Sequence, residues 1–174
     1  MTGASGGVGS VAVTLLNKLD YRVAAVTGRP EQNGDLLRSL GAQRIIERAE
    51  LAQPAKPLES TRWAGAVDTV GSQILAKVLA QTEYDGAVAA CGLAGGMDLP
   101  TTVMPFILRN VKLIGVDSVY CPYEKRVAAW QKVAELLPES YYAAASNEIA
   151  LEAVPEAAAQ IIRGEITGRT LVKL

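Results

Sequence analysis

The residues best placed to do chemistry are the glycines of a short segment, TGASGGVGS, near the start of the chain. Gly3, Gly6 and Gly9 recur at every third position, and an apolar pattern with helical spacing follows them. A phosphate can approach backbone N–H groups and the positive end of a helix only where no Cβ intervenes. Gly9 would also let that helix pack closely on a sheet. Because glycine also marks ordinary turns, the triplet alone is a weak indication of a nucleotide site.

A second candidate group, Thr27-Gly28-Arg29, ends the strand that we expect over residues 21–27. In dinucleotide-binding folds, a carboxylate at this point binds the ribose 2′-hydroxyl of NAD and repels a 2′-phosphate. A hydroxyl, an open backbone and a guanidinium instead suit a phosphate monoester, which favours NADP(H) over NAD(H). Arg48, just past the next strand, is a candidate second contact. The alternative is that Arg29 is a solvated turn residue and Arg48 an ordinary surface charge.

Two further features follow later strands. The glycine-rich loop 91–96 lies at the carboxyl end of a predicted strand, where open α/β sheets place ligands, and its glycines would let a nicotinamide ring lie against backbone. Asp68 ends the strand before it. No partner for acid–base work accompanies Asp68, so we interpret it as a turn or hydrogen-bonding residue and assign no catalytic residue.

Composition excludes several classes of protein. The chain has no histidine, which removes Ser-His-Asp and Cys-His catalysis and every histidine-containing metal site. Cys91 and Cys121 form no CxxC pattern, so no metal is expected and both thiols are interpreted as buried side chains in a reducing compartment. Its 17 basic and 18 acidic residues leave a net charge of −1, which disfavours nucleic acid as a partner. No signal sequence or membrane span is visible, and we expect a cytoplasmic protein with a small-molecule substrate.

Helices and strands alternate along the pattern. We expect a first helix whose apolar positions include Val11, Leu15 and Leu19, and a last strand over residues 169–174. Strands are expected at 21–27, 44–46, 65–70, 87–91 and 112–117, and helices at 35–40, 72–81, 103–109, 127–137 and 154–162. The segment between 49 and 63 is expected to be a surface connection. This order predicts an α/β fold, a Rossmann-type doubly wound parallel sheet in one domain, residues 1–174.

The chain resembles the nucleotide-binding part of the medium-chain dehydrogenase/reductase superfamily, in particular its quinone-oxidoreductase-like branch, which includes acryloyl-CoA reductases. The resemblance lies in the segments TGASGGVGSVAV, VTGR, RSLGA, WAGAVDTVG, LAKVLAQ, GAVAACGLAGG, LPTTVMPFILRNV, GVDSV, LPES and GRTLVKL. It implies NADPH-dependent, zinc-independent reduction of a conjugated C=C bond, in an acryloyl-CoA-like enoyl thioester or a quinone.

The resemblance also implies a cofactor site. Matching positions place Ser5, Gly6, Gly7 and Val8 at the pyrophosphate and Thr27, Gly28, Arg29 and Arg48 at the 2′-phosphate end. They place Leu93, Ile107 and Ser118 beside the nicotinamide half. Members commonly dimerise through the edge of the strand expected at 112–117, so we expect a homodimer that buries Val111, Leu113 and the segment 99–106.

Two departures from the family pattern bear on function. Family members carry a GroES-like domain ahead of this region, to which residues 165–174 would return, and a strand just before the glycine loop. Here only Met1 and Thr2 precede Gly3, so we expect most of the first strand to be lacking and the chain to be a fragment. The alternative to a reductase portion is a non-catalytic nucleotide-binding or dimerisation module. A methyltransferase using S-adenosylmethionine is disfavoured, because that ligand has no pyrophosphate for the glycine loop.

Overall fold

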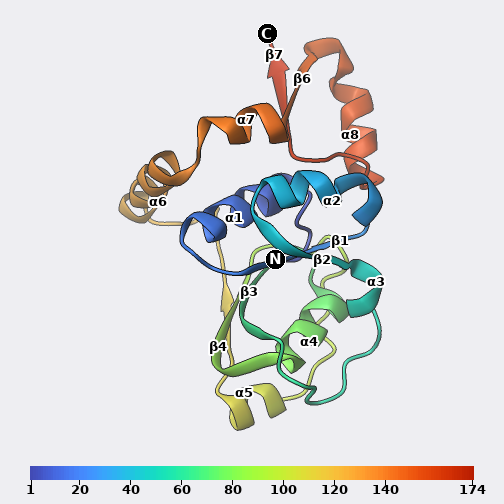
Figure 1. Cartoon of the computed structure of the whole chain (residues 1–174), viewed down its shortest axis with the longest axis vertical. Helices are drawn as coiled ribbons and strands as arrows, with labels where there is room; N and C mark the ends of the chain where they lie inside the picture. Colours follow the sequence, from blue (N-terminus) through green and yellow to red (C-terminus); the bar gives the residue numbers. More distant parts are fainter.

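The computed structural model describes all 174 residues as an α/β fold in which helices and parallel strands alternate (Figure 1). The elements are α1 (Gly7–Lys18), β1 (Val23–Thr27), α2 (Pro30–Ser39), β2 (Ala42–Glu47), α3 (Arg48–Leu51), β3 (Trp63–Asp68), α4 (Ser72–Ala80), β4 (Thr82–Ala90), α5 (Met104–Arg109), β5 (Lys112–Gly115), α6 (Tyr123–Leu136), α7 (Glu139–Ala145), β6 (Ser146–Ala150), the 3₁₀ turn η1 (Leu151–Ala153), α8 (Val154–Ile162) and β7 (Arg169–Lys173). The predicted α/β class and parallel pairing are confirmed.

The predicted doubly wound sheet, expected to lack most of its first strand, is present only in part, because the strands form three small sheets. Their orders are β1-β2, β3-β4-β5 and β6-β7, and all pairs are parallel. The first division falls between β1 and β3, which share no direct pairing. The third sheet is separate because β7 pairs only with β6. The strand β6 was not expected, since its sequence, SNEIA, is mostly polar.

The first four residues span the gap between β1 and β3. The Met1 amino group donates to Ala24 O at 2.9 Å, and Ala4 N donates to Val26 O at 3.0 Å. On the other side, Thr2 N donates to Val67 O at 3.1 Å. Figure 1 accordingly shows the amino terminus in the middle of the molecule, between the two sheets. This short segment contributes the hydrogen bonds of a central strand over only a few residues, which is why the sheet remains split.

Two apolar clusters hold the layers together. The lower cluster packs α4 under β1, β2 and β4; its buried members are Val26, Ile46, Leu51, Val70, Ile74, Leu75, Val78, Leu79, Val88 and Val111. The upper cluster joins β1 and β2 to α1, α2 and α7; its buried members are Ala4, Val13, Val23, Ala25, Leu37, Leu40, Ala42, Tyr141 and Ala145. The sheet is therefore covered on both faces near β1, as a doubly wound fold requires.

The buried face of α1 differs from the predicted one. Its buried residues are Gly9, Ser10, Val13 and Thr14, whereas Leu19 is 48% exposed. Two hydroxyls are accommodated because both have partners: Thr14 Oγ1 donates to Ser10 O, and the hydroxyls of Ser10 and Tyr141 lie 2.9 Å apart. Small residues on this face let the helix approach the sheet more closely than leucines would.

Other differences concern boundaries and exposure. Helix α2 begins at Pro30, where proline suits the first helical position, rather than at 35. The short helix α3 begins at Arg48 and extends into the segment expected to be only a connection. Cys91 is exposed and Cys121 half-buried, so their predicted burial is wrong; both lie in connections beyond strand ends. None of the helices combines the length and apolar character that a membrane crossing needs, and the cytoplasmic location stays a prediction.

Candidate functional site

The glycine loop is a close crossing of backbone between β1, β3 and α1. Gly3 has a φ of 59°, and a Cβ there would run into Thr69 Oγ1. A Cβ on Gly9 would meet Gly3 O and lie 2.7 Å from Ala4 Cα. The third glycine therefore lets α1 pack directly on the loop, as its spacing predicts.

The first turn of α1 presents unpaired donors. Gly6 is the N-cap residue and no side chain caps the helix. The N–H groups of Gly7, Val8 and Gly9 have no acceptor in the structure, and the first turn carries no acidic residue that would repel an anion. A 12-residue helix that begins this way offers backbone N–H groups and a partial positive charge to a phosphate.

Ser5 and Thr27 link this loop to the end of β1. Their hydroxyls lie 3.2 Å apart and both residues are buried, at 8% and 2% exposure. Thr27 Oγ1 also accepts from Arg29 N at 3.2 Å. The structure thus brings together the loop and the 27–29 segment, two groups of residues that the sequence places in one site.

Arg48 lies against the backbone of Gly28. A Cβ built on Gly28 would be 2.8 Å from Arg48 Cζ and 2.9 Å from its Nη2. The Arg48 side chain is exposed and makes no hydrogen bond or ion pair. A free guanidinium beside an open backbone at the carboxyl end of β1 is suited to an anionic group.

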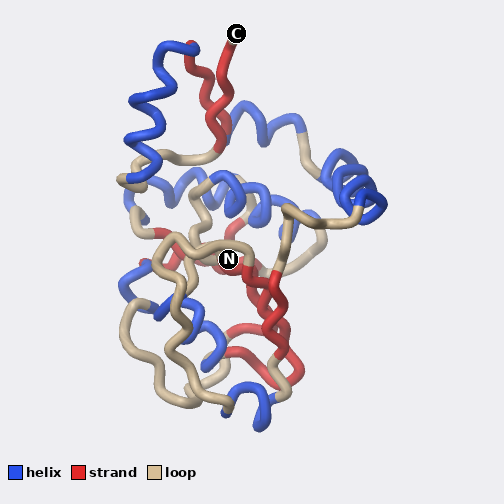
Figure 2. The backbone as a smooth tube through the Cα atoms, turned by 180° about the vertical axis from the view of Figure 1, so that it is seen from behind, coloured by secondary structure: helices blue, strands red, loops and turns tan.

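Arg29, by contrast, is already bonded within the chain. Its Nη1 donates to Glu165 O at 2.6 Å, and its Nη2 to Ile166 O at 2.9 Å and to Thr167 Oγ1 at 3.1 Å. These acceptors belong to the connection between α8 and β7. Figure 2 shows this connection passing between the β6–β7 pair and the helices α1 and α2. Arg29 is therefore neither the solvated turn residue of the alternative interpretation nor a free guanidinium.

Arg169, the first residue of β7, is a candidate that sequence reasoning missed. A Cβ on Gly7 would lie 3.3 Å from both Cδ and Nη1 of Arg169, so this side chain covers the start of α1. Arg169 is exposed and has no hydrogen bond or ion pair. Its position depends on Gly168, whose N–H donates to Ser5 O at 2.8 Å. No local pattern could have indicated this contact, because the two residues are far apart in the sequence.

Asp68 is fully buried behind the loop and makes the hydrogen bonds expected of it. Thr2 Oγ1 donates to its Oδ1 at 2.6 Å, and Gly71 N to its Oδ2 at 2.8 Å. Burial lowers the pKa of the nearby Met1 amino group from 8.0 to about 6, although the Asp68 charge opposes this. Partial desolvation of the thiol and the same carboxylate raise the pKa of Cys91, which disfavours a reactive thiolate.

The structure does not bring the three residues expected at the nicotinamide half together in one place. Leu93 lies in the loop after β4, and the backbone of that loop packs on Gly71. Ser118 follows β5, and its carbonyl accepts from Arg126 Nη2 at 2.8 Å. Ile107 is on α5, which Figure 1 places at the end of the molecule away from α1. Their role at a nicotinamide stays a prediction.

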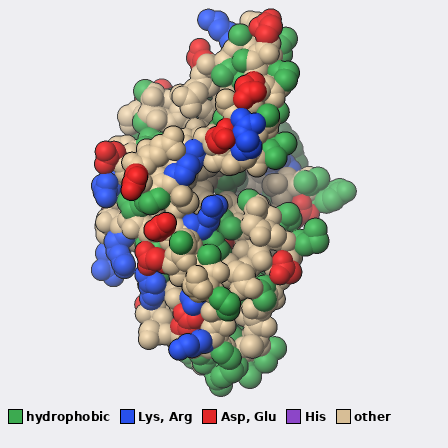
Figure 3. Space-filling model, turned by 90° about the vertical axis from the view of Figure 1, so that its right-hand side faces the viewer, with side chains coloured by type: hydrophobic (Ala, Val, Ile, Leu, Met, Phe, Trp, Pro, Cys, Tyr) green, Lys and Arg blue, Asp and Glu red, His purple; other side chains and the backbone are tan.

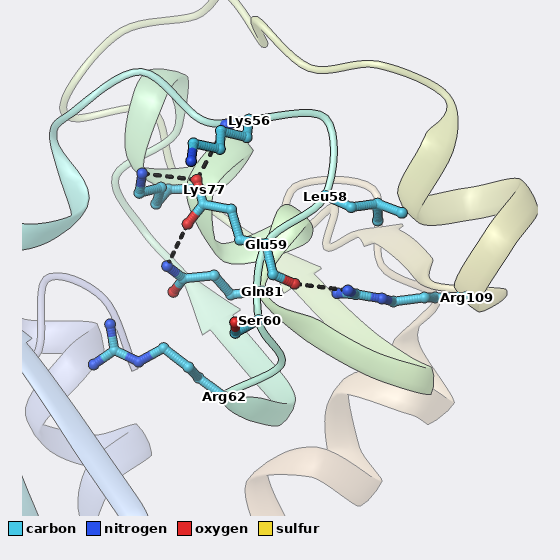
Figure 4. Close-up of a pocket in the computed structure, with 8 residues that line it drawn as sticks. All are labelled: Lys56, Leu58, Glu59, Ser60, Arg62, Lys77, Gln81 and Arg109. Atoms are coloured by element: carbon cyan, nitrogen blue, oxygen red, sulfur yellow. Dashed lines mark hydrogen bonds and ion pairs between the residues drawn. The ribbon is translucent and has the colours of Figure 1, made fainter.

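A separate hollow of about 720 Å³ lies near the amino ends of β3 and β4 (Figure 4). Glu59 is at its centre and accepts from Lys77 Nζ and Gln81 Nε2, each at 2.8 Å. Burial alone raises the pKa of Glu59, but these bonds and one from the Lys56 N–H outweigh it and lower the pKa to about 2. Arg109 donates to the carbonyls of Ala80, Thr82 and Glu59. Because these groups bond to one another, they form a structural junction that fixes the 52–62 connection.

Basic and acidic side chains are interspersed over the face of the molecule shown in Figure 3. The structure contains no group of three or more His, Cys, Asp or Glu side chains that could hold a metal ion. What the chain offers is a glycine loop with unpaired N–H groups, together with two unpaired guanidinium groups, Arg48 and Arg169. The fold and the loop define an α/β domain of the dinucleotide-binding class.

The comparison with known families agrees with this class. Residues 7–138 match the family described as “Zinc-binding dehydrogenase”. The chain belongs to this family of the medium-chain dehydrogenase/reductase superfamily, which confirms the resemblance drawn from the sequence.

Individual relatives are similar over the whole chain. It is 60% identical over 174 residues to “Probable acrylyl-CoA reductase AcuI” of Escherichia coli, covering 100% of this chain and 53% of the relative. It is 51% identical to “Acrylyl-CoA reductase AcuI” of Ruegeria pomeroyi over 99% of this chain and 52% of the relative. The chain thus spans about half the length of these curated relatives.

Solved structures give the same picture. The yhdH oxidoreductase from Salmonella enterica, in complex with NADP, superposes with a TM-score of 0.97 at 60% identity, over 99% of this chain and 53% of that one. The Bacillus subtilis protein yhfP with NAD bound superposes with a TM-score of 0.92 at 45% identity, over the same shares of the two chains.

Proposed function

We propose that this chain is the NADP(H)-binding part of a zinc-independent oxidoreductase that reduces a conjugated C=C bond. The substrate class would be an acryloyl-CoA-like enoyl thioester or a quinone. The main support for the proposal is the glycine loop. The N–H groups of Gly7, Val8 and Gly9 have no acceptor there, and no side chain caps the helix. Two relatives that are 60% identical support it: one is named “Probable acrylyl-CoA reductase AcuI”, and the other was crystallised with NADP.

The residues present fit the cofactor. Ser5, Gly6, Gly7 and Val8 would hold the pyrophosphate, because small residues and free N–H groups leave room for its oxygens. Thr27, Gly28, Arg29 and Arg48 would form the end of the site that accommodates the 2′-phosphate. Leu93, Ile107 and Ser118 are proposed for the nicotinamide half. The bound cofactor would supply the hydride, while this chain supplies binding and orientation.

Cofactor choice is the direct test. Binding of NADPH, NADH and S-adenosylmethionine to the 174-residue chain is measured by calorimetric titration at one salt concentration. We expect NADPH to bind about ten-fold or more tightly than NADH, since an unpaired guanidinium favours the extra phosphate. The yhfP structure with NAD makes this comparison necessary. Equal affinities would contradict the NADP(H) assignment, and absence of binding by both dinucleotides would contradict the function itself.

A second experiment separates the reductase portion from a non-catalytic nucleotide-binding module. NADPH oxidation is followed with acryloyl-CoA and, separately, with a quinone as acceptor. Turnover of either acceptor would support the reductase interpretation and identify the substrate class. Because the resemblance places most of the substrate pocket in a GroES-like domain ahead of this region, we expect the 174 residues alone to bind NADPH without turnover, and turnover near about one per second would contradict this expectation.

We also propose a homodimer through the free edge of β5, which pairs only with β4. The side chains available there differ from those expected. Val111 is already buried in the lower cluster and Leu113 packs against it, whereas Ile114 and Val116 are half exposed. Val103, on the neighbouring segment, is 65% exposed. An unpaired strand edge flanked by apolar side chains favours pairing with a second copy.

A further inference from the structure

The guanidinium of Arg29 is hydrogen-bonded to the connection between α8 and β7. Nη1 and Nη2 donate to the backbone carbonyls of Glu165 and Ile166 and to the hydroxyl of Thr167, at 2.6 to 3.1 Å. Nη1 also lies 3.3 Å from Gln32 Oε1. A phosphate could recruit these N–H groups only by displacing several of the acceptors, since each N–H supports one good hydrogen bond.

A second set of hydrogen bonds ties the same connection to α2. Thr167 Oγ1 donates to Asn33 Oδ1 at 2.9 Å, and Asn33 is buried, with only 2% exposure. Asn33 Nδ2 has no partner, so its only side-chain hydrogen bond is the one to this connection. A buried amide that pairs with Thr167 alone ties the connection to the first turn of α2.

These contacts fix the path of the chain into β7. Gly168 has a φ of 68°, and a Cβ there would collide with Ala145 O, so the turn admits only glycine without rearrangement. Its N–H reaches Ser5 O in the glycine loop at 2.8 Å. The next residue is Arg169, whose guanidinium consequently lies over Gly7 at the start of α1.

We infer that Arg29 is a positioning residue: through the 165–168 connection it places Arg169 beside the unpaired N–H groups of the glycine loop. It thereby supports binding of the diphosphate common to both dinucleotides, while discrimination for the 2′-phosphate rests on the unpaired Arg48. This inference rests on the proposed cofactor-binding function and assigns Arg29 a different role from a direct phosphate contact.

The test compares NADPH and NADH affinities of the unmutated chain with those of Arg29→Ala, Thr167→Val and Arg48→Ala. Thr167→Val removes the bonds to Arg29 and Asn33 without altering any charge. We expect Arg29→Ala and Thr167→Val each to weaken both cofactors by about ten-fold or more, and by the same factor within about two-fold. Arg48→Ala should weaken NADPH alone. A loss confined to NADPH in Arg29→Ala would overturn the inference and restore the direct phosphate contact.

A measurement without cofactor separates this inference from the proposed function. Hydrogen–deuterium exchange at the Gly168 amide is expected to accelerate by about ten-fold or more in Arg29→Ala and Thr167→Val, and to remain unchanged in Arg48→Ala. Unchanged exchange in the first two variants would refute the positioning role even if NADPH binds. If the unmutated chain binds neither dinucleotide, the proposed function fails, whereas the exchange result still decides whether Arg29 holds the connection. Should Arg29→Ala not fold, Arg29→Lys serves in its place, because lysine keeps the charge and loses the fork geometry.

Discussion

The guanidinium of Arg48 lies across the backbone of Gly28, so close that a Cβ on Gly28 would be 2.8 Å from Arg48 Cζ. The contact joins the first residue of α3 to the residue just beyond β1. Because Arg48 has no partner within the chain, its charge remains available, and the open backbone of Gly28 leaves space beside it. The pair therefore places an unpaired guanidinium against open backbone at the carboxyl end of β1.

The first prediction concerns Arg48. Arg48→Ala should weaken NADPH binding by roughly ten- to a hundred-fold, because a charge-assisted hydrogen bond contributes about 1.5 to 3 kcal/mol. Added salt should weaken NADPH binding to the unmutated chain more than to the variant. Titrations at two ionic strengths measure both effects. Arg44→Ala, an exposed arginine on β2, is the matched control and should leave the affinity unchanged. An equal loss in both variants would show that only net charge matters.

The second prediction concerns the close contact in the glycine loop. Gly9→Ala should lower the free energy of unfolding by about 1 to 3 kcal/mol, since the new Cβ meets Gly3 O and the Ala4 backbone, which cannot move aside freely. Gly34→Ala in α2 is the control, because there the Cβ meets only the mobile end of Arg38, at 3.3 Å. That variant should be neutral or slightly stabilising, as alanine is the better helix former. Urea denaturation of both distinguishes backbone collision from helix propensity.

Several of these features follow from local sequence and several do not. Glycine spacing and apolar runs predicted the loop, α1 and most strands, because turn geometry and burial act on neighbouring residues. The bond from Arg29 to Glu165 crosses 136 residues and the one between Ser10 and Tyr141 crosses 131. Such contacts depend on how distant segments fold together. Neither the hydrogen bonds of Arg29 to the 165–167 segment nor the contact of Arg169 with Gly7 could therefore be predicted from the sequence.

The division of the sheet shows a similar limit. The sequence indicated that little chain precedes Gly3, but not that Met1 to Ala4 would still pair with both β1 and β3. The sequence did not predict the strand β6 because its residues, SNEIA, are mostly polar. It pairs with β7 in a sheet separate from the other strands. Cys91 was expected to be buried from its residue type alone, whereas its position one residue past β4 leaves it exposed.

The third prediction follows from the buried amino terminus. Burial lowers the pKa of the Met1 amino group from 8.0 to about 6, so the folded chain binds fewer protons than the unfolded chain between these values. The free energy of unfolding should therefore fall as the pH is lowered from 8 to 6, by about 2 to 3 kcal/mol in all. No histidine is present to titrate in this window. Urea denaturation at intervals between pH 5.5 and about 8.5 checks this, and a flat profile would contradict the burial of the amino group.

The fourth prediction concerns the junction around Glu59. Glu59→Gln should lower the free energy of unfolding by about 1 to 3 kcal/mol, because it removes the ion pair with Lys77, whose side chain is only 13% exposed. The lowered pKa of Glu59 means that its contribution is present above about pH 4.5 and is lost as the pH falls toward 2. Arg38→Ala breaks the exposed pair with Asp35 and should change stability by less than about 0.5 kcal/mol. Similar losses in the two variants would argue against a structural junction.

The fifth prediction tests the dimer at the β5 edge. Strand β5 pairs with β4 on one side only, and Ile114 is 50% exposed on the segment that a second copy would cover. The unmutated chain should sediment as a dimer at tens of micromolar, the range in which an edge pairing with apolar flanks is expected to associate. Ile114→Glu should shift it to the monomer, because two like charges would face each other across the two-fold axis. Ile161→Glu on α8, a residue 64% exposed, adds the same charge elsewhere and should leave the dimer intact. Dissociation by both variants would indicate a general effect of charge, and a monomeric unmutated chain with freely exchanging β5 amides would refute the interface.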